Sequence, residues 1–391
     1  MKLGHFGIAH SAGVSAATSV AAAAGLILLL AGTSCVKLSP ASPEELRSGE
    51  QSVGLAYNVA LEQPYSLERP DAESGAQSPS EAQPRTKAAT AYSTSDSFKS
   101  FAWYLPEGKI WSADKDDAVA YFKDVTVEFQ TDKWRGADQQ YFWPKLGSLS
   151  FWSYSPAAIS ATGKASVTTE GVSLTEWTLD ETTNQDIDFM IADFKSDLKT
   201  NTLIYGYFGV PTLFRHKLAK VTVQASTAAD TSATNRVKIY KVSLKRVYTV
   251  GSYTPEKAAT ATSEAAAETW SNRSSLKEIV IFENSKGLAL GLTAQNITLD
   301  GNSLLVIPQV LNGGSSRGTS GVSLYIEYSI NGQKGTADKL LSDIKSQLWG
   351  IGQHTTYSIV VGEENEPIEF NAGVGDWGEG TSSDIIIGLT K

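Results

Sequence analysis

The sequence predicts an all-β protein. Short runs in which apolar and polar residues alternate recur from residue 98 onward, and this period of two is typical of half-buried strands. Turn-forming pairs such as Asn-Gly separate the runs, and the runs do not alternate with helical segments. Together these observations favour sheets packed face to face in a β-sandwich.

The first part of the chain predicts export rather than a folded domain. Residues 1–34 carry a positive start at Lys2, an apolar core from Val20 to Leu30 and a small-residue exit, as in a secretory signal. A membrane-spanning helix is the alternative, because the uncharged stretch is long enough to cross a bilayer. Cys35, the single cysteine, follows directly and leaves no partner for an internal disulfide. Three roles stay open for this thiol: an acylation site, a buried thiol, or a redox or catalytic nucleophile. Its position outside any packed domain favours acylation.

Residues 35–97 predict a tether, because they are rich in proline, serine, alanine and glutamate and cannot bury much apolar surface. One island at 53–61 breaks this composition with a strand-like alternation. A lone strand is unstable in water, so this one is expected to pair with a folded domain. The alternating apolar residues of the island are Val53, Leu55, Tyr57, Val59 and Leu61.

Later runs place their apolar residues on one face. The run at 237–247 alternates through Val237 and Ile239 and then shifts phase to Val242 and Leu244, which predicts a bulge or two successive strands. Three further runs predict strands with the apolar faces Val322, Leu324, Ile326, Tyr328 and Ile330; Tyr357, Ile359 and Val361; and Ile368, Phe370, Ala372 and Val374.

Two segments depart from the strand pattern. Residues 337–349 carry Leu340, Leu341, Ile344 and Leu348 at helical spacing, which predicts one helix. A further segment rich in alanine, threonine and glutamate predicts a long surface loop with some helix, at residues 255–272.

Charge and composition argue against several classes of function. The formal net charge is −9, and it becomes −10 once Lys2 is removed with the signal. An acidic chain without a basic cluster argues against nucleic-acid binding. After Cys35, no uncharged apolar stretch approaches the length of a membrane span.

The sequence predicts no enzymatic activity, no metal and no cofactor. His216 and His354 are the histidines outside the signal, and neither is accompanied by an activated nucleophile. The acidic run at 114–117 lacks the order of an EF-hand loop, so a solvated turn is expected rather than a calcium site. Paired carboxylates of a glycoside hydrolase stay open, because they would be distant in the sequence. Large aromatics fill a core or, alternatively, line a sugar site, and four of them cluster at Trp111, Trp134, Trp143 and Trp152.

Several stretches carry a family resemblance in the expected order. Residues 26–35, "LILLLAGTSC", resemble a bacterial lipobox, although Gly32 stands where leucine is usual. The other stretches are "YFWPKLGSLSFWSYSP" (141–156), "FMIADF" (189–194), "FRHKLAKVTVQA" (214–225), "LLVIPQV" (304–310), "LWGIGQHTTYSIVV" (348–361) and "IEFNAGVGDW" (368–377). Together they resemble the fimbrillin family of Bacteroidales surface lipoproteins, the subunits and accessory proteins of type V pili.

The resemblance implies a fold and a mechanism of assembly. The fold is two tandem transthyretin-like β-sandwiches, here expected at 98–210 and 211–391. The precursor is held at the outer membrane by lipid on Cys35, and a protease with arginine preference removes the first strand. A strand from the C-terminal region of another subunit then fills the groove. The implied partners are other pilin subunits, the outer membrane, the processing protease and a host or glycan ligand.

The resemblance also assigns residues to these steps. Cleavage is expected after Arg85, with Arg69 and Arg47 as alternatives, because Pro70 follows Arg69 and Arg47 precedes the strand. The candidate donor strand contains Ile385, Ile386, Ile387 and Leu389, which alternatively form the last strand of their own domain. The predicted function is a structural or adhesive pilus component. The alternative is a non-polymerising outer-membrane lipoprotein that binds glycans or host ligands.

Overall fold

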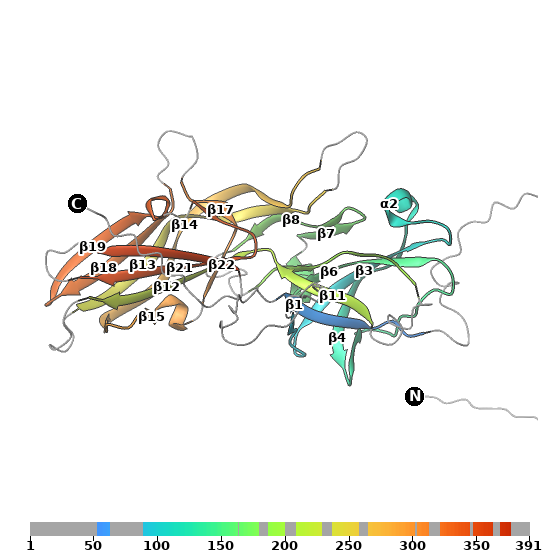
Figure 1. The fold of residues 1–391 in the computed structure, drawn as a ribbon, viewed down its shortest axis with the longest axis horizontal. Helices are drawn as coiled ribbons and strands as arrows, with labels where there is room; N and C mark the ends of the chain where they lie inside the picture. The colour runs from blue at the N-terminus through green and yellow to red at the C-terminus, as the bar shows by residue number, and fades with distance from the viewer. Residues whose placement is uncertain are drawn as a thin grey trace, which may run out of the picture. The chain divides into compact units, whose positions relative to one another are not determined.

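The computed structural model consists of strands joined by turns, with one α-helix of four residues in the part of the chain that it describes (Figure 1). This confirms the all-β prediction. None of the helices among the described residues has the length and apolar character needed to cross a membrane. The described residues are 53–62, 89–162, 164–179, 187–199, 209–228, 237–257, 265–301, 303–312, 321–344, 347–362 and 368–376.

The first sheet has nine strands, and seven of them close into a ring. Its strands follow the order β10-β6-β3-β4-β5-β1-β11-β9, and β9 also pairs with β6, which closes the path. Strand β2 pairs with β1 beside this path. The strands are β1 (Tyr57–Glu62), β2 (Ala89–Ala91), β3 (Ser97–Leu105), β4 (Val119–Gln130), β5 (Lys133–Gly136), β6 (Ser148–Ser155), β9 (Met190–Ala192), β10 (Lys195–Leu198) and β11 (Val210–His216).

The second sheet is organised around one long hairpin of β13 and β14. Along one edge β13 pairs with β14, and its other edge pairs first with β18 and then with β8. The strands are β7 (Ala165–Thr168), β8 (Gly171–Thr178), β13 (Val237–Thr254), β14 (Thr269–Ala289), β18 (Ser323–Ile330) and β19 (Gln333–Leu340).

The remaining strands form a five-stranded sheet and a two-stranded one. In the larger of these, β12 pairs in parallel with β21, and β21 pairs with β22. The strands are β12 (Ala219–Thr227), β15 (Gln295–Asn296), β16 (Leu304–Val306), β21 (Gln353–Val361) and β22 (Glu369–Asp376), and then β17 (Gln309–Val310) with β20 (Leu348–Trp349). The helical turns are α2 (Trp111–Asp114), η1 (Lys115–Asp117), η2 (Ala157–Thr162), η3 (Thr298–Gly301) and η4 (Leu341–Asp343).

Three clusters of buried side chains lie between these layers. One lies on the inner side of the β1 ring and contains Phe98 of β3. A second covers the opposite side of β3 with Phe101 and Trp103, and it includes Trp177 of β8 and Trp270 of β14. The third fills the space between β12 and β21 on one side and β13 and β18 on the other. Strand β3 is therefore buried on both faces.

Several sequence predictions are confirmed at the level of strands and register. The apolar faces of β18 and β21 are buried or half-buried, as alternation predicts. The phase shift in the run at 237–247 is a bulge within the single strand β13, between Ile239 and Lys241. The Asn331-Gly332 pair joins β18 to β19 with positive φ values of 51° and 82°, the conformation that suits a two-residue hairpin loop.

The helix predicted at 337–349 is wrong. Residues 333–340 form strand β19 and pair with β18, from Ser323↔Leu340 to Ile330↔Gln333. Among the described residues of this segment, the short turn η4 alone is helical, and its Leu341 is buried. The pairing with β18 satisfies the backbone of a whole strand, so it overrides a local helical pattern. The loop predicted at 255–272 is also too long, because β14 begins at Thr269.

The predicted division into sandwiches at 98–210 and 211–391 stays a prediction, as does the transthyretin-like topology. Strand β8 lies before the division and β13 lies after it, yet they pair in one sheet. Strand β11 begins at Val210 and belongs to the first sheet, whereas β12, which follows it, belongs to the five-stranded sheet. The long β13–β14 hairpin therefore packs against residues that precede the predicted division and against residues that follow it.

Candidate functional site

The backbone of residues 53–62 is held on both sides. The Leu55 amide donates to the Tyr141 carbonyl at 2.7 Å, and the Trp143 amide donates to the Val53 carbonyl at 2.9 Å. On the other side β1 runs parallel to β11, with five register pairs from Tyr57↔Val210 to Leu61↔Phe214. Because β1 pairs with both β5 and β11, its removal would open the ring of the first sheet.

A glycine allows β11 to approach β1 closely. Gly209 has a φ of +86°, which a residue with a side chain adopts only with strain. A Cβ atom at this position would lie 2.8 Å from the carbonyl carbon and oxygen of Ala56 and from the carbonyl carbon of Tyr57. The adjacent Val210 amide donates to the Ala56 carbonyl at 2.7 Å. Gly209 is thus fitted to the presence of β1.

The side chains of this segment divide into buried, half-buried and exposed groups. Leu55 and Tyr57 are buried, at 2% and 4% exposure, and belong to the inner cluster of the ring. Val59 and Leu61 are half-buried and pack against the same cluster. Val53 is 41% exposed and lies outside it. The predicted apolar face from Leu55 to Leu61 therefore packs against the cluster, although Ala56, on the other face, is also buried.

Tyr57 is the largest side chain that this segment inserts into the cluster. Its ring meets Phe98 edge-on at a centroid distance of 5.4 Å and Phe151 at 6.2 Å. Its hydroxyl donates to Ser100 Oγ at 3.0 Å, and Ser153 Oγ also donates to that oxygen at 3.0 Å. Burial raises the pKa of Tyr57, whereas the hydrogen bond to Ser100 acts in the opposite direction. A neutral phenol hydrogen-bonded within an aromatic core is costly to replace.

Tyr92, just after β2, extends this aromatic cluster. Its ring stacks on Phe214 at 5.2 Å and meets Trp134 edge-on at 5.2 Å. Its hydroxyl donates to the Ser97 carbonyl at 3.2 Å and lies 2.5 Å from Ser155 Oγ. Burial raises the pKa of Tyr92 to about 12, although the hydrogen bond with Ser155 lowers it.

We expect this phenol to make the protein sensitive to alkali. A tyrosine in the unfolded chain ionises near pH 10, so the stabilisation from Tyr92 is complete below about pH 10. The free energy of unfolding should then fall by on the order of 2 kcal/mol as the pH rises toward the folded-state pKa. Urea unfolding of wild type and Tyr92→Phe, measured between pH 9 and pH 12, checks this. The variant should lose less stability over this range, and equal slopes would assign the loss to other groups.

The other residues assigned by the family resemblance lie outside the described part of the chain. These are the lipidation candidate Cys35, the cleavage candidates Arg47, Arg69 and Arg85, and the donor candidates Ile385, Ile386, Ile387 and Leu389. Arg69 and Arg85 fall in the sequence between β1 and β2, which pair with each other from Ala60↔Ala91 to Glu62↔Ala89. A cut after Arg85 would therefore separate two paired strands.

The histidines occupy structural positions. His216 Nδ1 lies 2.7 Å from Asp188 Oδ2 at the end of β11. His354 lies in strand β21, and its Nε2 is 2.8 Å from Thr222 Oγ1. No group of three potential metal-ligating side chains occurs among the described residues. In the acidic run, Asp117 pairs with Lys109 and Lys115 pairs with Glu170 at 2.6 Å, in an exposed turn.

The four clustered tryptophans pack in hydrophobic cores, which is one of the two roles predicted for them; the other was to line a sugar site. Trp111, Trp134 and Trp143 are buried, and Trp152 is half-buried and stacks on Phe194 at 4.2 Å. Gly209 and Ser100 were not predicted from the sequence to be parts of the β1 site. The signal for Gly209 is weak, since a single glycine before a strand has many uses.

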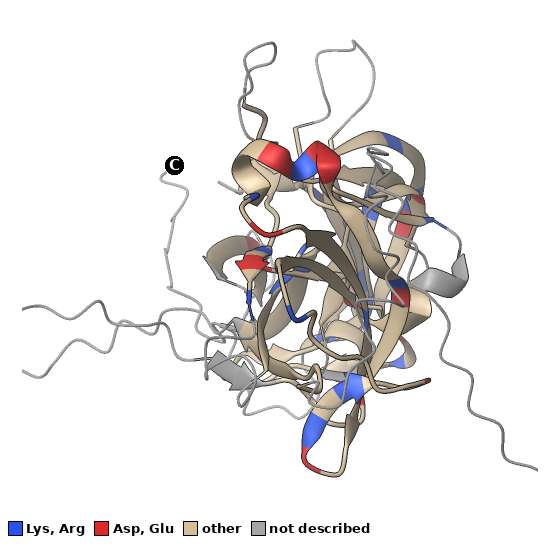
Figure 2. Cartoon of the chain, turned by 90° about the vertical axis from the view of Figure 1, so that its right-hand side faces the viewer, with Lys and Arg blue, Asp and Glu red and all other residues tan. Residues whose placement is uncertain are grey.

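Basic and acidic residues are interspersed on the face shown in Figure 2. In most of the ion pairs among the described residues the carboxylate is exposed and the base is partly buried, as in Asp132, which lies 3.1 Å from Arg135. Mixed charge of this kind does not form the basic stripe that nucleic acids require.

Solved structures of bacterial surface proteins are similar to this chain. A fimbrial protein from Bacteroides vulgatus has 14% identity and a TM-score of 0.48, with 83% of this chain and 99% of that chain covered. A protein from Bacteroides uniformis, described as a candidate cell adhesion protein, has 18% identity and a TM-score of 0.46, with 83% and 99% covered. A comparison with curated proteins found no match.

The family comparison covers most of the chain. A fimbrillin-like family model matches residues 86–377, which include every described strand after β1. Such a match indicates a protein of a cell-surface fimbrium that associates with other pilin subunits. The chain therefore belongs to the fimbrillin-like family and is a structural pilus or adhesion component, not an enzyme.

Proposed function

We propose that the chain is a pilus subunit that is exported as a lipoprotein and assembles by strand exchange after proteolysis. The observation that carries this proposal is the position of β1, which pairs on both edges and closes the ring of the first sheet. Strand β1 is also a separable element, because a long segment of sequence lies between it and β2. Lipid on Cys35 would tether the precursor to the outer membrane until β1 is removed.

Loss of β1 would leave a groove with two kinds of unsatisfied surface. Strand β11 and the backbone of Tyr141 and Trp143 would lose their hydrogen-bonding partners. The inner cluster would lose Leu55 and Tyr57, and each buried side chain of this size contributes about 1.5–3 kcal/mol. An extended strand with alternating apolar residues would restore both.

Arg85 is the cleavage site that suits this geometry. Cleavage there frees β1 but leaves β2 and the rest of the sheet on the mature chain. The family match begins at residue 86, so the segment that would be lost lies outside the matched region, which supports the proposal. Arg69 would also release β1, but the following Pro70 disfavours cleavage, and Arg47 precedes the strand.

The incoming strand would come from a second copy of the chain. Ile385, Ile386, Ile387 and Leu389 supply apolar residues near the C-terminus, although their alternation is irregular. If they instead form a strand of their own domain, the subunit would accept a donor without supplying one. The chain would then occupy a terminal position in the pilus.

The test is the mature N-terminus of the protein on the native cell surface, determined by intact mass and terminal peptide mapping. We expect a start at Thr86 in polymers, and a full-length, non-polymerised lipoprotein when Arg85→Ala is introduced. Arg69→Ala is the matched control and should be processed normally. A lipid-modified start at Cys35 in all of the wild-type protein would contradict strand exchange. It would favour a standalone lipoprotein that binds glycans or host ligands.

A further inference from the structure

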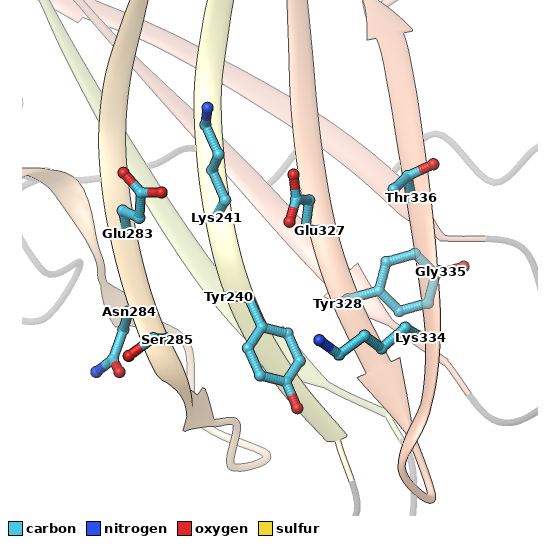
Figure 3. A pocket seen from close by; sticks show the side chains of 10 residues that line it. All are labelled: Tyr240, Lys241, Glu283, Asn284, Ser285, Glu327, Tyr328, Lys334, Gly335 and Thr336. Atoms are coloured by element: carbon cyan, nitrogen blue, oxygen red, sulfur yellow. The ribbon is translucent and has the colours of Figure 1, made fainter.

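A pocket of about 650 Å³ lies on the second sheet, over strands β14, β13, β18 and β19. Figure 3 shows the side chains that line it, with Tyr240 between β14 and the β18–β19 hairpin. The volume falls within the range of about 300–1,000 Å³ that small-ligand sites occupy. On β13 the lining residues lie between Ile239 and Val242, which belong to the hydrophobic core, and Tyr328 of the lining also packs against that core.

Irregularities in two strands create this pocket. From the pair Ile239↔Leu288 to the pair Lys241↔Glu283, β13 advances by two residues and β14 by five. The three extra residues make β14 bulge beside the pocket, where Asn284 and Ser285 contribute to the lining. On β13 the same irregularity places Tyr240 and Lys241 side by side, both half-buried, between core residues.

The charged side chains of the pocket alternate in sign across the sheet. Lys241 is in register with Glu283 of β14 on one side and with Glu327 of β18 on the other, and Glu327 is in register with Thr336 of β19. Lys334 is the second lysine of the lining. Two lysines and two glutamates give the lining no net charge, and they present donors and acceptors in turn.

An aromatic ring lies among these polar groups. The Tyr240 hydroxyl is 3.2 Å from Ser329 Oγ, which fixes the ring across the strands. Gly287 makes room for the ring, since a Cβ there would lie 2.9 Å from Tyr240 Cε1. The Lys334 ammonium lies 5.0 Å from the ring centroid, an exposed cation–π contact worth about 0.5–1 kcal/mol. A ligand can displace so weak a contact at little cost.

We propose that this pocket binds a neutral oligosaccharide. Sugar hydroxyls both donate and accept hydrogen bonds, so a row of alternating carboxylates and ammonium groups can satisfy several of them at once. The C–H groups on the face of a sugar ring carry a slight positive charge and suit the negative face of Tyr240. The Asn284, Ser285 and Thr336 side chains add neutral polar groups at the margin.

Charge decides between a neutral glycan and an ionic ligand. The lining is balanced and the whole chain has a formal net charge of −9, so a sialylated or sulfated glycan gains no net attraction. A cationic ligand would meet the ammonium groups of Lys334 and of Lys241, which pairs with Glu278 at 3.0 Å. Neutral hydroxyl-rich ligands avoid both penalties.

The proposal does not depend on strand exchange. The pocket is built from strands of the second sheet, whereas β1 closes the first sheet. A polymerising subunit and a standalone lipoprotein would both display it. If the N-terminal processing experiment fails, the binding proposal is therefore unaffected. If no oligosaccharide binds, the strand-exchange proposal is equally unaffected.

The experiment uses the full chain without its signal on a printed panel of oligosaccharides. The panel contains neutral hexose, fucose and N-acetylhexosamine oligosaccharides, their sialylated and sulfated counterparts, and a set of peptides. We expect binding to at least one neutral oligosaccharide, weakened at least tenfold by Tyr240→Ala and several-fold by Glu283→Gln. Lys339→Ala is the matched control, because Lys339 is on β19 but outside the pocket and pairs with Asp343 at 3.7 Å.

Thermal unfolding of each variant separates lost binding from lost folding. If Tyr240→Ala does not fold, Glu283→Gln and Thr336→Val carry the test, because both residues are exposed. The proposal is overturned if no neutral oligosaccharide binds, if the pocket variants bind as well as Lys339→Ala, or if only charged glycans or peptides bind.

Discussion

Replacing Tyr57 by alanine is expected to lower the free energy of unfolding of the unprocessed chain by about 3–5 kcal/mol. The ring is buried to 4% exposure and meets Phe98 and Phe151 edge-on, so its loss leaves a cavity in the first sheet. The Ser100 hydroxyl also loses the hydrogen bond that Tyr57 donates at 3.0 Å. Urea unfolding of the purified chain measures this change.

Two variants dissect the contribution of Tyr57. Tyr57→Phe keeps the ring but removes the hydrogen bond, so it should cost only about 1 kcal/mol. Asn58→Ala is the matched control, because Asn58 is the next residue on β1 and is exposed, and it should change stability by less than about 0.5 kcal/mol. If Tyr57→Ala were as mild as Asn58→Ala, β1 would not be an integral part of the core.

Gly209→Ala should destabilise the unprocessed chain by two separable effects. The positive φ of +86° strains an alanine by about 1–3 kcal/mol. The new Cβ would also lie 2.8 Å from backbone atoms of Ala56 and Tyr57, and relieving this overlap should cost a further amount of about 1–3 kcal/mol. We expect β1 to move outward, which should make the segment before β2 easier to cleave with a protease.

Gly108 offers a control that isolates the contact with β1. It has a φ of +84°, nearly that of Gly209, but an added Cβ would meet nothing within 4 Å. Gly108→Ala should therefore show the backbone strain alone. In a chain that starts at Thr86 and lacks β1, the two substitutions should cost the same. If Gly209→Ala still lowers the free energy of unfolding more than Gly108→Ala does in that shorter chain, the contact with β1 is not the cause of the difference.

The predictions for Tyr57, Gly209 and Arg85 concern successive stages of strand exchange. Tyr57 and Gly209 test how firmly β1 is held, and Arg85 tests whether the cell removes it. A strand that contributes several kcal/mol does not leave spontaneously. Strand exchange therefore requires that cleavage at Arg85 be followed by capture of a donor strand, which restores comparable contacts.

The irregularity in β13 could be predicted from the sequence, but the pocket beside it could not. The shift from Ile239 to Val242 in the apolar phase predicts an irregularity, and the bulge is found there. Its consequence was not visible in the sequence, because the pocket also needs Glu283 of β14 and Glu327 of β18 in register with Lys241. Those neighbours are set by pairing between distant segments.

The segment at 337–349 shows the opposite case. Leu340, Leu341, Ile344 and Leu348 have helical spacing, but Lys339 and Leu340 pair with Leu324 and Ser323 of β18. A two-residue turn at Asn331-Gly332 brings the chain back alongside β18 and makes that pairing local and favourable. The Asn331-Gly332 turn before the segment was therefore a better indicator of its structure than the helical spacing of its apolar residues.

The sequence by itself determined the all-β class, most strand faces, the presence of an irregularity in β13 and the resemblance to fimbrillins, because each is encoded in short runs of residues. The tertiary structure alone decided that β1 closes a ring between β5 and β11, that Gly209 is fitted against it, and that strands β8 and β13 share a sheet. The physical reason is that alternation specifies which side of a strand is buried, whereas the identity of its neighbours depends on hydrogen bonds and packing between residues far apart in the chain.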